Sequence, residues 1–357
     1  MPPIRGAPTV RQSGVDAHSA THESRAETRR HHQARATPSS RSCGEHTEAC
    51  HRLSSVFAHS TRQVASSNDV SVVVYDEAAV SAPRTASRSV SSAHPLPALL
   101  FSHATGFHGR VFAPVASHLP EFDRTTFDYR GYGDTTPPRD WSLTWQGFGD
   151  DALAVARTMA TTTGKPVIGV GHSMGGAGLI MAALREPQHF AGLIVFEPII
   201  FPPEARTQSA RANPLAEVTR RRRRSFPTYA DAIANFAAKP PLSSLHPDSL
   251  AAYVHHGFVQ RKDGVELKCD PEFEAQTYEM GAFHDTWQRL GELRTPTWVM
   301  AGASAEMSPA AIAPRVAERI PGCTFVEWRD LGHFGPLDAP ARFAAFVREI
   351  AAGISAR

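Results

Sequence analysis

The stretch GVGHSMGGAG, residues 169–178, follows an apolar run and sets one serine, Ser173, among five glycines. Its central residues GHSMG match the pattern G-x-S-x-G, in which a serine stands on a sharp turn between a strand and a helix. Glycines two residues before and after the serine leave the space that such a turn needs. A plain glycine-rich turn is the alternative reading, but the expected strand before and helix after Ser173 favour a nucleophile.

The segments around this stretch alternate between apolar strands and amphipathic helices, which is typical of a mostly parallel sheet covered on both faces. Apolar runs predict strands, and apolar residues at helical spacing predict the helices. Gly164 should end the helix that begins near residue 145. The expected strands are 70–77, 96–102, 125–129, 165–171, 190–200, 296–302 and 323–330, and the expected helices are 145–163, 173–186, 308–320 and 339–354.

The alternation is interrupted between residues 201 and 295, where helix-like segments are separated by prolines. This pattern predicts a helical cap inserted before the penultimate strand, over the carboxyl edge of the sheet, where open α/β sheets bind ligands. Residues 66–200 and 296–357 then form the two parts of the core. Residues 1–65 are rich in Arg, Ser, Thr and His with few large apolar residues, so we expect a disordered N-terminal extension.

The 357 residues are 41% hydrophobic and 20% charged with a net charge of +2, which is ordinary for a soluble globular protein. This charge does not indicate a nucleic-acid or membrane partner, and there is no secretory signal pattern. The four cysteines show no CxxC pairing, which argues against a zinc site or a disulfide framework. We therefore expect a cytoplasmic protein without metal or cofactor, acting on a small molecule; its oligomeric state is left open.

His333 is the candidate base for Ser173. A serine hydroxyl is a weak nucleophile unless a base takes its proton. His333 lies in the stretch DLGHFGPLDAP, directly after the last expected strand and between glycines. That position brings it to the same carboxyl edge as Ser173. The backbone N–H of Met174, at the start of the following helix, can point at a developing oxyanion.

Four stretches of the chain, SHATGFHG, FDYRGYGDT, GHSMGG and LGHFGPLDAP, together resemble the α/β-hydrolase fold superfamily over roughly residues 70–354. The resemblance implies the chain order serine, acid, histidine, with a second oxyanion donor in the loop after an early strand. Here that loop reads HATGF, residues 103–107, and we assign the second donor to the N–H of Thr105.

Two carboxylates are candidates for the acid that orients His333. The resemblance places the acid after the penultimate strand, where Glu306 is the carboxylate present, although relatives usually carry aspartate there. Glu197, at the end of the strand before the insertion, is the alternative, because relatives such as haloalkane dehalogenases place their acid there. We assign Glu306 first and keep Glu197 as the alternative.

The chemistry expected from Ser173 and His333 is cleavage of a small or medium carboxylic ester through an acyl-enzyme. Carbon–carbon bond hydrolysis, perhydrolysis and non-catalytic ligand binding remain alternatives, because one fold supports many functions. The run Arg220–Arg224 within the insertion is expected to form a solvated helix face or helix end. A nuclear localisation signal or a site for an acidic substrate is the alternative for this run.

Overall fold

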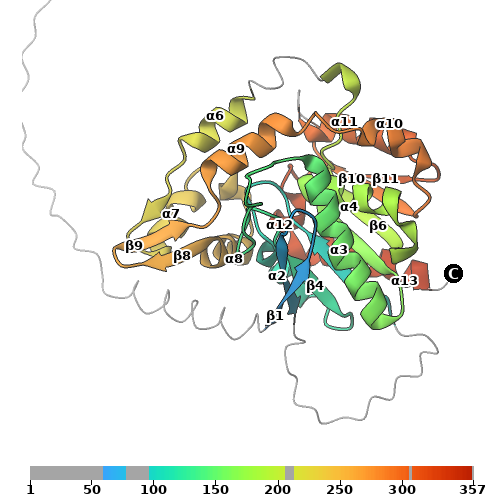
Figure 1. Ribbon diagram of the computed structural model, residues 1–357, viewed down its shortest axis with the longest axis horizontal. Helices are drawn as coiled ribbons and strands as arrows, with labels where there is room; N and C mark the ends of the chain where they lie inside the picture. The colour runs from blue at the N-terminus through green and yellow to red at the C-terminus, as the bar shows by residue number, and fades with distance from the viewer. Residues whose placement is uncertain (1–58, 78–95, 206–212, 305–307, 356–357) are drawn as a thin grey trace, which may run out of the picture. The chain divides into compact units, whose positions relative to one another are not determined.

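The computed structural model describes residues 59–77, 96–205, 213–304 and 308–355 (Figure 1). Within them, an eight-stranded sheet runs in the order β1-β2-β4-β3-β5-β6-β10-β11. The strands β1, β2 and β4 pair antiparallel, and every other neighbouring pair from β4 to β11 is parallel. Its strands are β1 (His59–Ala65), β2 (Ser71–Glu77), β3 (Leu99–Ser102), β4 (Arg124–Phe127), β5 (Val167–His172), β6 (Phe190–Phe196), β10 (Thr297–Gly302) and β11 (Thr324–Trp328).

Helices cover both faces of this sheet. One apolar cluster joins the sheet to α3, α4 and α11, and a second joins it to α2 and α13. Gly164, with φ +68°, ends α3 as the sequence predicts. The predicted α/β-hydrolase architecture is therefore confirmed. These helices are α2 (Ala113–Ser117), α3 (Trp145–Thr163), α4 (Met174–Arg185), α11 (Pro309–Arg319), α12 (Gly335–Asp338) and α13 (Pro340–Ser355).

Strand β1 corrects the predicted start of the ordered chain. Residues 59–65 fall inside the extension expected to be disordered, yet they pair along their whole length with β2. Most side chains of β1 are exposed, so its apolar pattern is weak and composition alone does not reveal it. Backbone hydrogen bonds to β2 define this edge strand instead. Residues 1–58, and the polar segment 78–95 for which no element was expected, lie outside the described residues.

The insertion, residues 201–295, contains the expected helices and also a three-stranded antiparallel sheet in the order β7-β9-β8. This small sheet was not predicted, because its strands are only two to four residues long. Helices α6 and α9 lie side by side in Figure 1. The elements are α6 (Pro214–Arg220), β7 (Ser225–Phe226), α7 (Tyr229–Ala237), α8 (Pro247–Gly257), β8 (Phe258–Arg261), β9 (Gly264–Leu267), α9 (Pro271–Met280) and α10 (Thr286–Arg289). No helix within the described ranges is long and apolar enough to cross a membrane.

Candidate active site

Ser173 stands on a strained turn between β5 and α4. Its φ is +56°, a conformation that non-glycine residues rarely adopt and that often marks functional sites. A Cβ on Gly171 would come within 2.7 Å of Gly176 Cα, and a Cβ on Gly175 within 2.2 Å of the Ser102 carbonyl oxygen. Both glycines are thus required by close backbone packing, which the G-x-S-x-G pattern anticipates. Ser173 therefore lies at the carboxyl end of β5, next to the end of the neighbouring strand β3.

Glu197 follows β6 and is completely buried in a second strained conformation, with φ +46°. Hydrogen bonds on either side of Glu197 join its loop to Ser173: the Ser173 N–H donates to the Phe196 carbonyl (2.9 Å), and the Ile199 N–H donates to the Ser173 carbonyl (3.2 Å). One carboxylate oxygen, Oε1, accepts from the Gly302 N–H at 2.8 Å. The other oxygen is left facing the loop that carries His333.

His333 lies in the loop between β11 and α12, and its Nδ1 is 2.5 Å from Glu197 Oε2. The loop is fixed at the end of β10, where the Ala303 N–H donates to the Leu331 carbonyl at 2.7 Å. A Cβ on Gly302 would lie 2.5 Å from that same carbonyl oxygen, so the loop can pack there only against glycine. With Nδ1 engaged by Glu197, Nε2 of His333 is the nitrogen left for the serine side.

His172, the residue before Ser173, contacts the His333 loop directly. Its Nε2 lies 2.8 Å from the His333 carbonyl oxygen, and the two imidazole rings are 4.8 Å apart. Burial, with a smaller contribution from His333, holds the pKa of His172 well below its usual range. A neutral His172 therefore donates a hydrogen bond to the backbone of His333. No sequence pattern signals this contact, because it joins residues 161 positions apart.

The loop after β3 carries Thr105, and a buried imidazole fixes its start. The Tyr129 N–H donates to His103 Nε2 at 3.0 Å, while His103 Nδ1 lies 2.8 Å from the Ala104 carbonyl oxygen. This arrangement defines a neutral imidazole with its proton on Nδ1. Burial lowers the pKa of His103 to about 4, which agrees with that assignment. The loop thus leaves β3 along a fixed path beside Gly175.

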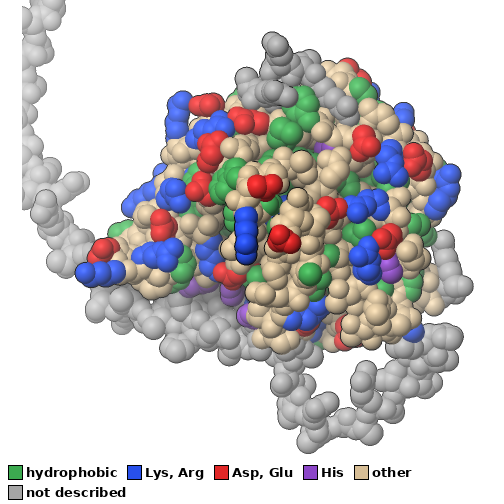
Figure 2. All heavy atoms as spheres, in the orientation of Figure 1, with side chains coloured by type: hydrophobic (Ala, Val, Ile, Leu, Met, Phe, Trp, Pro, Cys, Tyr) green, Lys and Arg blue, Asp and Glu red, His purple; other side chains and the backbone are tan. Residues whose placement is uncertain are grey.

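The structure brings Ser173, His333 and Glu197 to one edge of the sheet, whereas Glu306 lies outside the described residues. Met174 is the first residue of α4, directly after Ser173. The arginine run belongs partly to a helix end, because α6 stops at Arg220. Alternate members pair with acids of α9: the partly exposed Arg220 with Glu272, and the half-buried Arg222 with Glu274. Figure 2 shows basic and acidic side chains intermingled across this face of the molecule.

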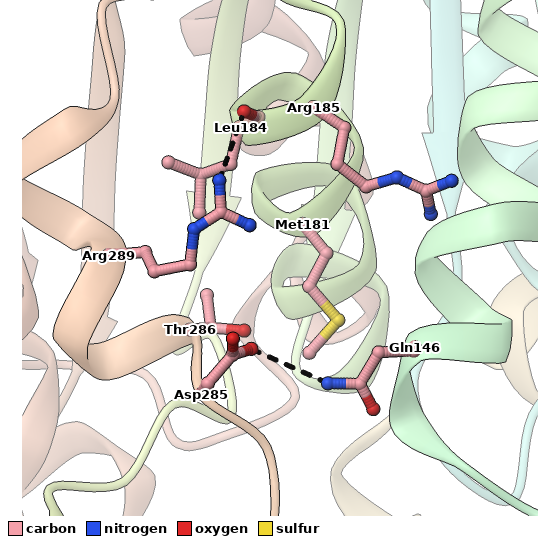
Figure 3. A pocket seen from close by; sticks show the side chains of 7 residues that line it. All are labelled: Gln146, Met181, Leu184, Arg185, Asp285, Thr286 and Arg289. Atoms are coloured by element: carbon pink, nitrogen blue, oxygen red, sulfur yellow. Dashed lines mark hydrogen bonds between the residues drawn. The ribbon is translucent and has the colours of Figure 1, made fainter.

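Two hollows among the described residues lie away from Ser173. A cavity of about 40 Å³ lies between α3, α4 and α10, where Gln146 reaches Asp285 across its mouth (Figure 3). A wider cleft of about 300 Å³ lies between the loop after β4 and α9, lined by Trp141 and Phe273. Neither hollow is lined by Ser173, Glu197 or His333. In the part of the chain that the structure describes, no three His, Cys, Asp or Glu side chains are grouped to hold a metal ion.

Residues 99–346 match the alpha/beta hydrolase family. The chain belongs to this family. Among curated proteins it is similar to monoglyceride lipase of Rattus norvegicus, with 36% identity over 107 residues, which is 29% of this chain and 35% of that protein. The chain therefore matches only about a third of the length of this relative.

Two solved structures share the fold at low sequence identity. E-2-(acetamidomethylene)succinate hydrolase aligns with a TM-score of 0.66 and 18% identity, covering 82% of this chain and 98% of that one. A thermophilic esterase from Thermogutta terrifontis aligns with a TM-score of 0.60 and 21% identity, covering 83% of this chain and 99% of that one. These likenesses agree with the alpha/beta hydrolase fold of the family.

Proposed function

We propose that the protein is a serine hydrolase that cleaves a small or medium carboxylic ester through an acyl-enzyme intermediate. The observation that carries the proposal is that the strained Ser173 turn is hydrogen-bonded to the loop of Glu197, whose buried carboxylate contacts His333. A nucleophile, a base and an orienting acid at one edge of a sheet are the parts that acyl transfer requires. The similarity to a monoglyceride lipase and to an esterase supports an ester as substrate.

In this proposal Glu197, not Glu306, is the acid of the triad. Its carboxylate lies against His333 Nδ1 and holds the proton on that nitrogen, so Nε2 is free to act as a base. Burial of Glu197 and its second hydrogen bond from the Gly302 N–H fix the carboxylate in one orientation. The imidazolium that forms during the reaction is stabilised by the same carboxylate.

The reaction follows from these roles. His333 Nε2 takes the proton of the Ser173 hydroxyl as Oγ attacks the ester carbonyl carbon, and the carbonyl oxygen becomes an oxyanion. We assign its hydrogen bonds to the N–H groups of Met174 and Thr105. The leaving alcohol takes the proton from His333, which leaves an acyl-serine. Water, deprotonated by His333, then attacks the acyl carbon, the acid is released and Ser173 regains its proton.

The test is hydrolysis of p-nitrophenyl esters from acetate upward, with Ser173→Ala beside the parent and Ser117→Ala as the matched control. Loss of the nucleophile should lower kcat by about 10⁴-fold or more. Among the described residues the Ser117 hydroxyl bonds only to the nearby Pro114 carbonyl, so its variant should keep parental activity. A folded parent that hydrolyses none of the esters, or a Ser173→Ala variant that keeps its rate, would refute the proposal.

A further inference from the structure

Helix α9 of the insertion brings a buried carboxylate against the loop that carries Thr105. Gly106 has φ +80°, and a Cβ there would lie 2.6 Å from Glu274 Oε1 and 3.7 Å from the Tyr278 hydroxyl. The start of the same loop packs close to the turn of Ser173, because the Ser102 and His103 carbonyl oxygens lie against Gly175. The Phe107 ring, at its far end, lies 5.4 Å from Phe334 beside His333. Glu274 and Tyr278 therefore adjoin the loop that borders the reacting serine.

One carboxylate oxygen of Glu274 accepts a hydrogen bond and the other does not. Oε2 accepts from Arg222 at 2.6 Å, and the same guanidinium donates to the Tyr253 hydroxyl. Among the described residues, Oε1 of Glu274 accepts no hydrogen bond, and the Tyr278 hydroxyl makes none. Five side-chain polar atoms in the described ranges are enclosed without a partner, and neither of these two is among them. Both atoms therefore keep some accessible surface.

Helix α9 is anchored firmly enough to present these atoms at fixed positions. The Tyr132 hydroxyl bonds to Thr277 Oγ1 at 2.9 Å, and the Trp145 indole N–H donates to the Thr277 carbonyl at 3.1 Å. Tyr132 in turn packs on His103, with ring centroids 5.5 Å apart. The helix is thus tied to the same residues that fix the loop after β3.

The chemistry of the two atoms defines what they can bind. A carboxylate oxygen only accepts hydrogen bonds, whereas a tyrosine hydroxyl can donate one. A group that both donates and accepts, such as an alcohol hydroxyl, satisfies both. Arg222 neutralises the charge of Glu274 through its ion pair, so the site does not favour an ammonium group over a neutral hydroxyl. Glu274 is 3% exposed, and a buried carboxylate oxygen without a hydrogen-bond partner costs free energy. A substrate that carries the hydroxyl is therefore favoured over one that lacks it.

We propose that Glu274 Oε1 and the Tyr278 hydroxyl form a subsite for a hydroxyl group of the substrate, so that the enzyme prefers hydroxylated esters. This inference rests on the proposed ester hydrolysis. Glu274 accepts the hydroxyl proton, and Tyr278 donates to the hydroxyl oxygen.

The test compares matched esters by titrating the acid released. Ethyl 3-hydroxybutanoate against ethyl butanoate places the hydroxyl on the acyl side, and 3-hydroxypropyl butanoate against propyl butanoate places it on the alcohol side. We expect the parent to prefer the hydroxylated member of one pair by about tenfold in kcat/KM, as one charge-assisted hydrogen bond allows. Tyr278→Phe should reduce that preference to about twofold, mainly through KM. It removes a hydroxyl that bonds to none of the described residues, so it leaves none of them without a partner.

Glu274→Gln should likewise reduce the preference, and Glu272→Gln is its matched control. Glu272 lies on the same helix, and its carboxylate pairs with Arg220, so its variant should keep the parental preference. Equal hydrolysis of both members of each pair by the parent, or a Tyr278→Phe variant that keeps the parental preference, would overturn the subsite. A parent that cleaves neither member of either pair would instead overturn the proposed ester hydrolysis, and the subsite with it.

Discussion

The carboxyl edge of the sheet and the insertion are stabilised in different ways. At the edge, backbone groups fix the candidate catalytic residues: the backbone of Ser173 is bonded to residues on both sides of Glu197, and the Glu197 carboxylate accepts from the Gly302 N–H. In the insertion, α6 and the residues after it are joined to α9 by side-chain ion pairs, among them Arg220 with Glu272 and Arg222 with Glu274.

This difference distinguishes the edge, whose geometry is fixed by the backbone, from the insertion, whose contacts change with the side chains. Backbone hydrogen bonds at the edge do not depend on side-chain identity except where glycine is required, so the edge can be recognised from a short pattern. The ion pairs of the insertion depend on which acid faces which base. Substitutions there can change the surroundings of the substrate while the edge stays intact, which is the expected division between reaction and specificity.

The strongest test of the edge is Glu197→Gln. The amide keeps the shape and can still accept from the Gly302 N–H, but it presents an N–H to His333 and favours the wrong tautomer. We expect kcat for a p-nitrophenyl ester to fall by about 10³- to 10⁴-fold with the fold retained. Glu306→Gln is the control and should keep most of the activity. The opposite pattern, with Glu306→Gln inactive and Glu197→Gln active, would identify Glu306 as the acid of the triad.

The insertion is tested by Arg222→Met. This variant leaves the buried Glu274 carboxylate without its partner and should lower the free energy of unfolding at pH 7 by about 2–3 kcal/mol. Burial already raises the pKa of Glu274 while Arg222 lowers it, so without Arg222 the carboxyl binds a proton more readily. A raised pKa in the folded state means that the loss is complete at high pH and shrinks as pH falls toward 5.

Urea unfolding at pH 7 and pH 5 measures both effects. Arg221→Met is the control, because that side chain is 80% exposed and should change stability by less than about 0.5 kcal/mol. Equal losses for the two arginines would contradict a buried ion pair within the insertion.

Acid pH tests the neutral imidazole of His103 at the edge. Its pKa is lowered to about 4 by burial, against about 6.5 in an unfolded chain. Between these values the unfolded chain binds a proton that the folded protein does not, so stability falls as pH drops from 6.5 to about 4. One such group contributes up to about 1.4 kcal/mol per pH unit.

His103→Gln, whose amide can replace both hydrogen bonds, should flatten the pH dependence of urea unfolding by that amount. Exposed His118 is the control, and His118→Gln should leave the slope unchanged. An unchanged slope in His103→Gln would show that the edge does not depend on an uncharged imidazole at this position.

The sequence by itself determined the alternation of strands and helices, the turn at Ser173 and the position of His333 after the last strand. These features are local: apolar periodicity, glycine spacing and chain order are visible without knowing which segments meet. The edge strand β1 escaped detection for the same reason, because its exposed side chains carry little apolar pattern and backbone pairing with β2 defines it.

Only the tertiary structure decided which groups meet. Glu197 reaches His333 because β6 lies beside β10, where the Gly302 N–H and a positive φ aim the carboxylate. Arg222 is half-buried, and α9 supplies its partner Glu274 from 52 positions away. Such contacts arise from the packing of segments distant along the chain. Their partners are selected by geometry and charge in three dimensions, which local pattern does not encode.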